Sequence, residues 1–240
     1  MKNSSVPGST ESRSCFWGMK MKSAFFFVVF LGLGTASAMD VGLAANRRIC
    51  GLRGANTAEK IATLAKRVPL PEDLPLARSV LLEEGQMMCW GDAALVLAFA
   101  GSVDGPSIIV KQLRQVPSEY QGHVFFDEMV VSLGLALRQS PERQATLTLL
   151  NSMLSPSWWG PVSDPSSLAA TRAVGFARLS IIALCFSGTK EATSLLELLH
   201  KDETRLQPLG ADAKQFVERA LSRNRFRMDN PVGTLIPEDL

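Results

Sequence analysis

The residues best suited to covalent or acid–base chemistry are a few cysteines and two histidines. Cys89 stands beside Trp90 and Gly91 and is the strongest nucleophile candidate. A cysteine nucleophile needs a nearby base and a stabilised thiolate, whereas the residues around Cys89 form an apolar helix. His123 and His200 lie far from it in the sequence, and we interpret both as surface or helix-end residues.

Adjacent carboxylates are the second group with chemical potential. The pairs are Asp127 with Glu128, Glu83 with Glu84, and Asp202 with Glu203. Neighbouring residues on a helix point in different directions, so we predict solvated helix ends rather than a glycosidase acid and nucleophile. The sequence has no Walker loop, GxGxxG, GxSxG, HExxH or calcium loop. We therefore predict no catalytic residue, no cofactor and no metal site.

Trp158 and Trp159 are the best candidates for contact with another protein. They stand together between Pro156 and the Gly160–Pro161 pair. Aromatic side chains on a stiff loop bury much area at little entropic cost, which suits a binding anchor. The alternative, which we prefer, is that the two rings fold back over a gap between helices.

The elements that must position these residues are helices, because strand signals are scarce. Asn56 and Glu59 have the spacing of a capping box, which predicts a helix start. A second helix is expected over residues 74–84. Ser140 and Thr189 have the residue type of further N-caps.

Three blocks between residues 87 and 202 each combine a strongly apolar helix, a short break and an amphipathic helix. Offsets of 37 and 49 residues bring their apolar positions into register, and Leu113, Leu150 and Leu199 are identical. The second offset is longer because of a proline- and serine-rich segment at 155–168, which we predict to be a loop. A period of about 40 residues is typical of a helical solenoid.

These blocks resemble HEAT-type repeats of the bilin-lyase-like class, in degenerate copies. The glycine and aspartate usual in the turn of that class occur together only as Gly101 and Asp104. The resemblance implies an all-α fold, a short right-handed α-α superhelix, with an irregular helical bundle as the alternative. The predicted repeats are residues 87–116, 125–154 and 173–202. They belong to a predicted helical domain at 39–228, and we expect an extended tail at 229–240.

Residues 19–38 have the pattern of a cleavable bacterial secretory signal peptide. Lys20 and Lys22 precede an apolar run of 11 residues, and small residues ending at Ala38 form the cleavage site. A bilayer-spanning helix needs about 20 apolar residues, so a retained anchor is the weaker interpretation. We expect residues 1–18 to be untranslated or disordered. The mature chain would then be periplasmic or secreted, with no membrane span.

The expected mature chain is almost neutral. Four of the 25 basic residues and one of the 23 acidic residues lie before Met39, which leaves 21 and 22. Nucleic acid is therefore not an expected partner, because phosphate binding requires a concentrated basic surface. A local exception near the C-terminus, which we interpret as a solvated helix end, comprises Arg219, Arg223, Arg225 and Arg227.

Three cysteines remain in the expected mature chain: Cys50, Cys89 and Cys185. Cys89 and Cys185 stand in apolar helical runs, where a thiol usually behaves as a small hydrophobe. The alternative is one disulfide between Cys50 and Cys89, which an oxidising compartment would permit.

Two functional hypotheses follow from these patterns. The favoured one is an exported helical-repeat protein that acts as a protein–protein interaction module or scaffold in the bacterial envelope. The alternative is an exported enzyme whose active site the sequence does not identify, for example Cys89 with a distant histidine. Repeat folds commonly bind proteins, but a fold by itself names no ligand.

Overall fold

A computed structural model describes residues 48–160 and 167–236. Within these ranges the chain is all-α and contains no strand, which confirms the predicted fold class. The expected leader and signal peptide, with the other residues of 1–47, lie outside the described residues, as do 161–166 and 237–240. The α-helices are α2 Thr57–Arg67, α3 Asp73–Leu82, α4 Trp90–Phe99, α5 Gly105–Leu113, α6 Val124–Gln139, α7 Arg143–Met153, α8 Pro156–Trp159, α9 Leu168–Ser187, α10 Lys190–Lys201, α11 Glu203–Leu206 and α12 Ala213–Asp229. Three 3-10 turns join them: η1 Glu84–Cys89, η2 Ser118–Tyr120 and η3 Gln207–Leu209.

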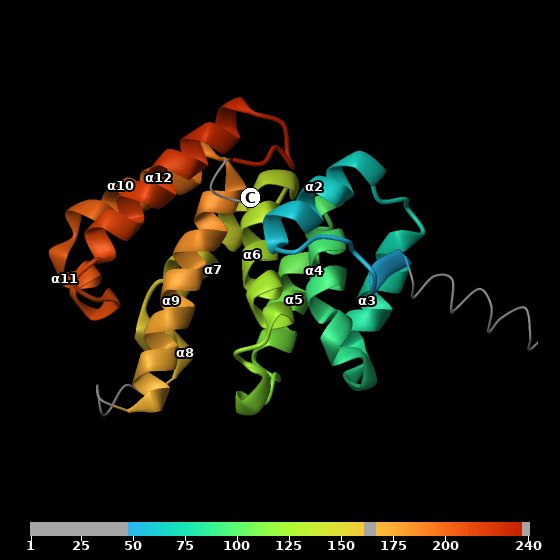
Figure 1. The fold of residues 1–240 in the computed structure, drawn as a ribbon, viewed down its shortest axis with the longest axis horizontal. Coiled ribbons are helices and arrows are strands. Elements are labelled where there is room, and N and C mark those ends of the chain that lie inside the picture. Colours follow the sequence, from blue (N-terminus) through green and yellow to red (C-terminus); the bar gives the residue numbers. More distant parts are fainter. Residues whose placement is uncertain (1–47, 161–166, 237–240) are drawn as a thin grey trace, which may run out of the picture. The chain divides into compact units, whose positions relative to one another are not determined.

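The core is built around α4, α6 and α9, which lie side by side (Figure 1). α6 occupies the middle and packs on α4 along one side and on α9 along the other. In α4 every residue from 90 to 98 is buried. A helix covered on several sides needs apolar residues around most of its circumference, which explains why these three helices were recognisable from their composition.

A second set of helices, α5, α7 and α10, covers these core helices. α5 and α7 pack on α6, while α7 and α10 pack on α9. These helices are amphipathic, and α7 buries only Thr146, Leu150 and Met153. At the two ends, α3 packs on α4 and α5, and α12 packs on α9 and α10.

Two glycines allow the core helices to approach closely. A Cβ atom on Gly134 of α6 would overlap the backbone carbonyl oxygen of Ala183 in α9. At Gly91 of α4, the same atom would collide with the Glu128 carboxylate and would lie 2.9 Å from the Phe125 Cα atom in α6. Both contacts between core helices therefore depend on a missing side chain.

The predicted helix starts are partly correct. Asn56 caps α2 by accepting a hydrogen bond from the Glu59 amide at 3.0 Å, and Thr189 caps α10. Ser140 was assigned wrongly. It is the C-cap of α6, where its amide donates to the Ala136 carbonyl oxygen at 2.7 Å, and α7 begins only after Glu142.

The segment at 155–168 is not entirely a loop. Pro156–Trp159 forms one helical turn, and Ser167 is the N-cap of α9. Residues 230–236 follow α12 without helix, and Ile236 is 6% exposed. These residues lie beside the start of the domain, since a Cβ on Gly233 would meet Ala65 of α2.

Polar side chains fasten α12 to the turn between α9 and α10. Asn224 is fully buried and accepts from the Ser187 hydroxyl at 3.1 Å and the Thr189 amide at 3.3 Å. Its amide group donates to the Thr189 carbonyl at 3.0 Å and to the Thr193 hydroxyl at 2.7 Å. All its hydrogen-bonding groups are therefore used inside the protein.

The prediction of a solvated arginine cluster near the C-terminus is wrong for Arg227, which is buried. Its side chain is only 6% exposed, and its guanidinium lies 4.3 Å from the centre of the Phe186 ring. Arg225 does lie at the surface, where it pairs with Glu197 at 2.8 Å. A cation stacked on an aromatic ring keeps favourable electrostatics after losing water, which allows Arg227 to be buried.

α9 is long and apolar enough to cross a membrane by length and composition alone. A core helix of a soluble protein passes the same test. In the described domain, α9 packs against α6, α8 and α12, as a core helix does.

Candidate functional site

Trp159 is integrated into the core. Its indole nitrogen donates to the Met153 carbonyl oxygen at 2.9 Å. The centre of its ring lies 5.2 Å from that of Phe176 in α9 and 6.1 Å from that of Phe126 in α6. Substituting Trp159 would therefore disturb packing as well as any contact with a partner.

Trp158 lies outside Trp159. The two rings meet edge to face at 4.7 Å, and the Arg114 guanidinium lies 5.1 Å from the Trp158 ring centre. Both tryptophans are half-buried. Both predicted binding residues therefore pack on the core. Trp159 contacts the rings of Phe126 and Phe176, whereas Trp158 contacts only the Trp159 ring among the aromatic pairs.

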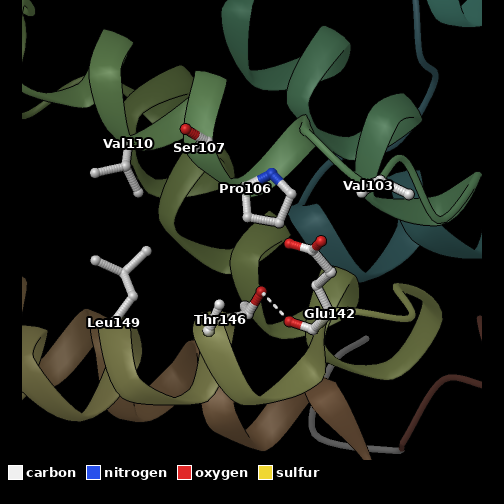
Figure 2. Close-up of a pocket in the computed structure, with 8 residues that line it drawn as sticks. Val103, Pro106, Ser107, Val110, Glu142, Thr146 and Leu149 are labelled. Carbon is white, nitrogen blue, oxygen red and sulfur yellow. Dashed lines mark hydrogen bonds between the residues drawn. The ribbon is translucent and has the colours of Figure 1, made fainter.

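The helices α5 and α7 border a groove of about 280 Å³. Pro106 and Val110 of α5 face Thr146 and Leu149 of α7 across it (Figure 2). Val103 stands at its edge and is 53% exposed. Most of the lining is apolar, so the groove suits an apolar side chain of another molecule.

A second groove of about 370 Å³ lies between α7 and α10. Leu147 of α7 and Leu195 of α10 supply apolar lining, and Leu198 is 64% exposed. Gln144 and Ser194 add uncharged polar groups. α7 is therefore a ridge with one groove on each side.

The residues that α7 gives to the two grooves follow helical spacing. Its contributions to the first groove are Glu142, Ala145, Thr146 and Leu149, and to the second Gln144, Leu147, Thr148 and Asn151. Each set has the spacing i, i+3, i+4 and i+7, which places it on one face of a helix. Two adjacent faces of one helix thus serve two grooves.

The two grooves are also related by the offsets of 37 and 49 residues that bring the sequence blocks into register. Adding 49 to the α7 residues of the first groove gives the α10 residues of the second, which are Glu191, Ser194, Leu195 and Leu198. The offset of 37 relates Ser107 and Val110 of the first groove to Gln144 and Leu147 of the second. The grooves are therefore equivalent positions of successive helix pairs.

Each groove has a glutamate at the start of its second helix. Glu142 is the N-cap of α7, and its carboxylate projects toward Pro106 (Figure 2). Glu191 stands at the equivalent place in the first turn of α10. A basic side chain beside an apolar anchor would find a carboxylate in either groove.

Elsewhere, sequence reasoning missed a cluster of buried charges. Lys60 Nζ of α2 lies 2.8 Å from Asp92 Oδ1 in α4 and 2.6 Å from Glu128 Oε1 in α6. Glu128 is 1% exposed, so the prediction of a solvated helix end is wrong for it. A helical wheel contains the signal, because Glu128 shares its face with the buried Val131 and Leu135.

Burial and the neighbouring charges have opposite effects on the pKa values of Glu128 and Lys60. Burial raises the pKa of Glu128, although the hydrogen bond and charge of Lys60 work against the rise. Burial by itself would lower the pKa of Lys60, but its bonds to Asp92 and Glu128 outweigh that effect and raise the pKa. The ammonium is therefore kept charged between two carboxylates, which is a structural arrangement.

The thiol and imidazole groups of the enzyme hypothesis have other neighbours. His200 Nε2 lies 2.9 Å from Glu218 Oε1. The His123 ring packs beside Tyr120 and Phe125, with ring centres 5.5 and 6.0 Å away. Cys89 is a neighbour of Cys50 and helps to raise the pKa of that thiol. Across 48–160 and 167–236, no group of three or more His, Cys, Asp or Glu side chains could hold a metal ion.

The chain matches no protein family model, no curated protein and no solved structure. Its function has therefore to be inferred from its own geometry. The equivalent grooves on α5, α7 and α10 are recesses of the described surface that an apolar side chain of a ligand could enter.

Proposed function

We propose that this chain is a helical-repeat scaffold that binds another protein through the face formed by α5, α7 and α10. The observation that carries the proposal is the pair of equivalent grooves on the two sides of α7. Repeat proteins present the same surface element several times, and a partner can use successive copies at once. The α-α superhelix and HEAT-type repeats remain part of this proposal.

The partner that fits this face best is an amphipathic helix. Packed helices lie about 8–10 Å apart, so grooves on the two sides of α7 are separated by about that distance. An α-helix rises about 1.5 Å per residue, so apolar residues at i and i+7 would reach both grooves. Lysine or arginine next to each anchor would meet Glu142 and Glu191.

Binding is tested first with two substitutions at the groove edges. Val103→Gln and Leu198→Gln remove exposed apolar area from the first and second groove respectively. A partner recovered with the tagged wild-type protein, then purified, should bind each variant at least about tenfold more weakly by calorimetry. The double variant should show no measurable binding.

Two matched controls lie outside the grooves. Val124 is 64% exposed and Leu168 is 67% exposed, at the first positions of α6 and α9. Val124→Gln and Leu168→Gln remove the same residue types at similar exposure and should leave the affinity unchanged. Equal losses in all four variants, with circular dichroism showing folded protein, would reject the grooves as the binding surface.

The glutamates give an independent test of the partner's charge. Glu142→Lys and Glu191→Lys should slow association and reduce its dependence on salt, because rim charges act mainly on the association rate. Stopped-flow kinetics at two ionic strengths measures both quantities. Faster association with the variants would mean that the partner is acidic, against the proposal.

We also propose export, which rests on the pattern at residues 19–38. Mass spectrometry of a C-terminally tagged protein from envelope extracts should find a chain that begins at Met39. An uncut apolar segment would contradict a cleaved signal while leaving the binding proposal intact. The two proposals therefore fail separately.

A further inference from the structure

The segment at residues 50–52 runs along the start of α4. The Leu52 amide donates to Asp92 Oδ2 at 3.3 Å, and Cys50 Sγ lies 3.8 Å from Gln86 Oε1. Cys89 stands midway between Gln86 and Asp92 in the sequence, three residues from each. Cys89 is the N-cap of α4 and stands three residues before Asp92, and residues three apart share a side of a helix, so Cys89 faces the same segment.

Two thiols meet at this place. Cys89 is near enough to Cys50 to help raise the pKa of its thiol, and both side chains are half-buried against the core. They are both free thiols in this structure. Cys185, by contrast, lies in α9 and is only 3% exposed. Small reagents therefore have access to Cys50 and Cys89 before they reach Cys185.

We propose that Cys50 and Cys89 form a disulfide when the protein meets a disulfide oxidant, and that this bond fastens the start of the domain to α4. The oxidant belongs to the chemical class of disulfides, whether a small molecule such as oxidised glutathione or the disulfide of an oxidoreductase. The inference does not depend on the proposed binding function. It identifies a modification site that the favoured interpretation of the sequence had left as separate thiols.

The reaction begins at Cys89. Burial, the neighbouring Cys89 and the Asp92 charge raise the pKa of Cys50 to about 12, so Cys50 keeps its proton. The Cys89 thiol loses its proton to water and its sulfur attacks one sulfur of the oxidant, which gives a mixed disulfide and releases one thiolate. Once Cys89 is part of the mixed disulfide, it no longer acts as a thiol neighbour that raises the pKa of Cys50.

Cys50 completes the exchange. Its thiol loses its proton to water, and its sulfur attacks the Cys89 sulfur of the mixed disulfide. The new sulfur–sulfur bond forms as the oxidant's second thiolate leaves. Two protein thiols have then lost two electrons and two protons, and one oxidant disulfide has become two thiols.

The bond would close a ring that contains α2 and α3. α2 is held to the rest of the domain by Lys60, whose ammonium bonds Asp92 in α4 and Glu128 in α6. A covalent link at Cys50 adds a second attachment beside this ion cluster. Closing a ring of this length reduces the freedom of the unfolded chain and so stabilises the folded protein.

The experiment uses reduced, folded protein equilibrated in a series of glutathione redox buffers. Acid quenching, alkylation and intact mass determination count the remaining thiols, and peptide mapping identifies the linked pair. Wild type and Cys185→Ser should both form the Cys50–Cys89 bond. Oxidation should raise the thermal midpoint by about 5–15 °C in both proteins.

Three controls decide the inference. Cys50→Ser and Cys89→Ser should show no intrachain disulfide and no change of thermal midpoint between oxidised and reduced buffer. In guanidinium chloride, the wild-type pair should need at least about tenfold more oxidised glutathione, since folding brings the thiols together. A linked pair that includes Cys185, or no disulfide in folded protein at any glutathione ratio, would overturn it.

Discussion

Two sets of helices differ in how much of their surface is buried. One is the layer formed by α4, α6 and α9, and the other is the face formed by α5, α7 and α10. In the layer, every residue of α4 from 90 to 98 is buried, and helices meet at Gly91 and Gly134 without an intervening side chain. On the face, α7 buries only three side chains and borders two open grooves.

The difference shows where stability and binding reside. Helices in close contact cannot accommodate a larger side chain, so substitutions in the layer should lower the stability of the folded protein. Val103 and Leu198 at the groove edges are exposed, so substitutions of these two residues should act on a partner and leave folding nearly unchanged. Stability and affinity can therefore be measured as separate responses to mutation.

Gly134→Ala should have the largest effect on the layer. The new methyl group would overlap the Ala183 carbonyl oxygen, which is backbone and cannot rotate away. Moving α6 away from α9 should lower the free energy of unfolding by roughly 3–5 kcal/mol. Urea denaturation followed by circular dichroism measures it.

A glycine without neighbours provides the control. A Cβ on Gly175, in α9, would meet no atom within 4 Å. Gly175→Ala should therefore raise the free energy of unfolding by about 0.5–1 kcal/mol, because alanine favours the helix. If both alanines act alike, the close approach of α6 and α9 is not what requires Gly134.

Lys60→Met should have the next largest effect, because it leaves Asp92 and Glu128 without their cation. Breaking a buried ion pair by removing one partner should cost about 3 kcal/mol at pH 8. The control is Lys66→Met on the exposed side of α2, expected to change stability by at most about 0.5 kcal/mol. Equilibrium urea titrations of both variants give the comparison.

The Lys60→Met effect should depend on pH. Burial already raises the pKa of Glu128, and Lys60 opposes that rise. Removing Lys60 raises the pKa further, so folded protein binds a proton at a pH where the unfolded chain has lost it. Stability of the variant then falls as pH rises through this window, and its deficit should be smaller at pH 5 than at pH 8. A deficit that grows toward pH 5 would contradict a charged, buried Glu128.

Asn224→Ala tests the polar attachment of α12. It removes four hydrogen bonds and leaves the Thr189 amide and carbonyl groups without that partner. We expect a loss of about 2 kcal/mol, because buried polar groups lose their bonds without regaining water. Ser222→Ala, an exposed change in the same helix, should be nearly neutral. Thermal denaturation of the two variants distinguishes them.

Local patterns in the sequence were sufficient to predict most of the longer helices, but not the helical turn at Pro156–Trp159. α4, α6 and α9 have apolar residues around most of their surface, and Asn56 and Thr189 cap helices as expected. The N-cap prediction for Ser140 was wrong because Ser140 is the C-cap of α6 and α7 begins three residues later, at Arg143.

Contacts between distant residues could not be predicted in this way. Lys60 and Glu128 are 68 positions apart, and nothing near either residue indicates the other. The buried Arg227 likewise depends on Phe186, which belongs to another helix. The grooves are an intermediate case, since the offsets of 37 and 49 were visible but the residues left uncovered between α5, α7 and α10 required the structure.

The smallest expected effect on stability is at the grooves. Leu198 is 64% exposed, and Leu198→Gln exchanges two residues of similar helix propensity. The free energy of unfolding should therefore change by less than about 0.5 kcal/mol, the same as for Leu168→Gln. Only the partner's affinity should separate these two variants. A large loss of stability at Leu198 would mean that this leucine supports the core, and the distinction between the layer and the face would then fail at α10.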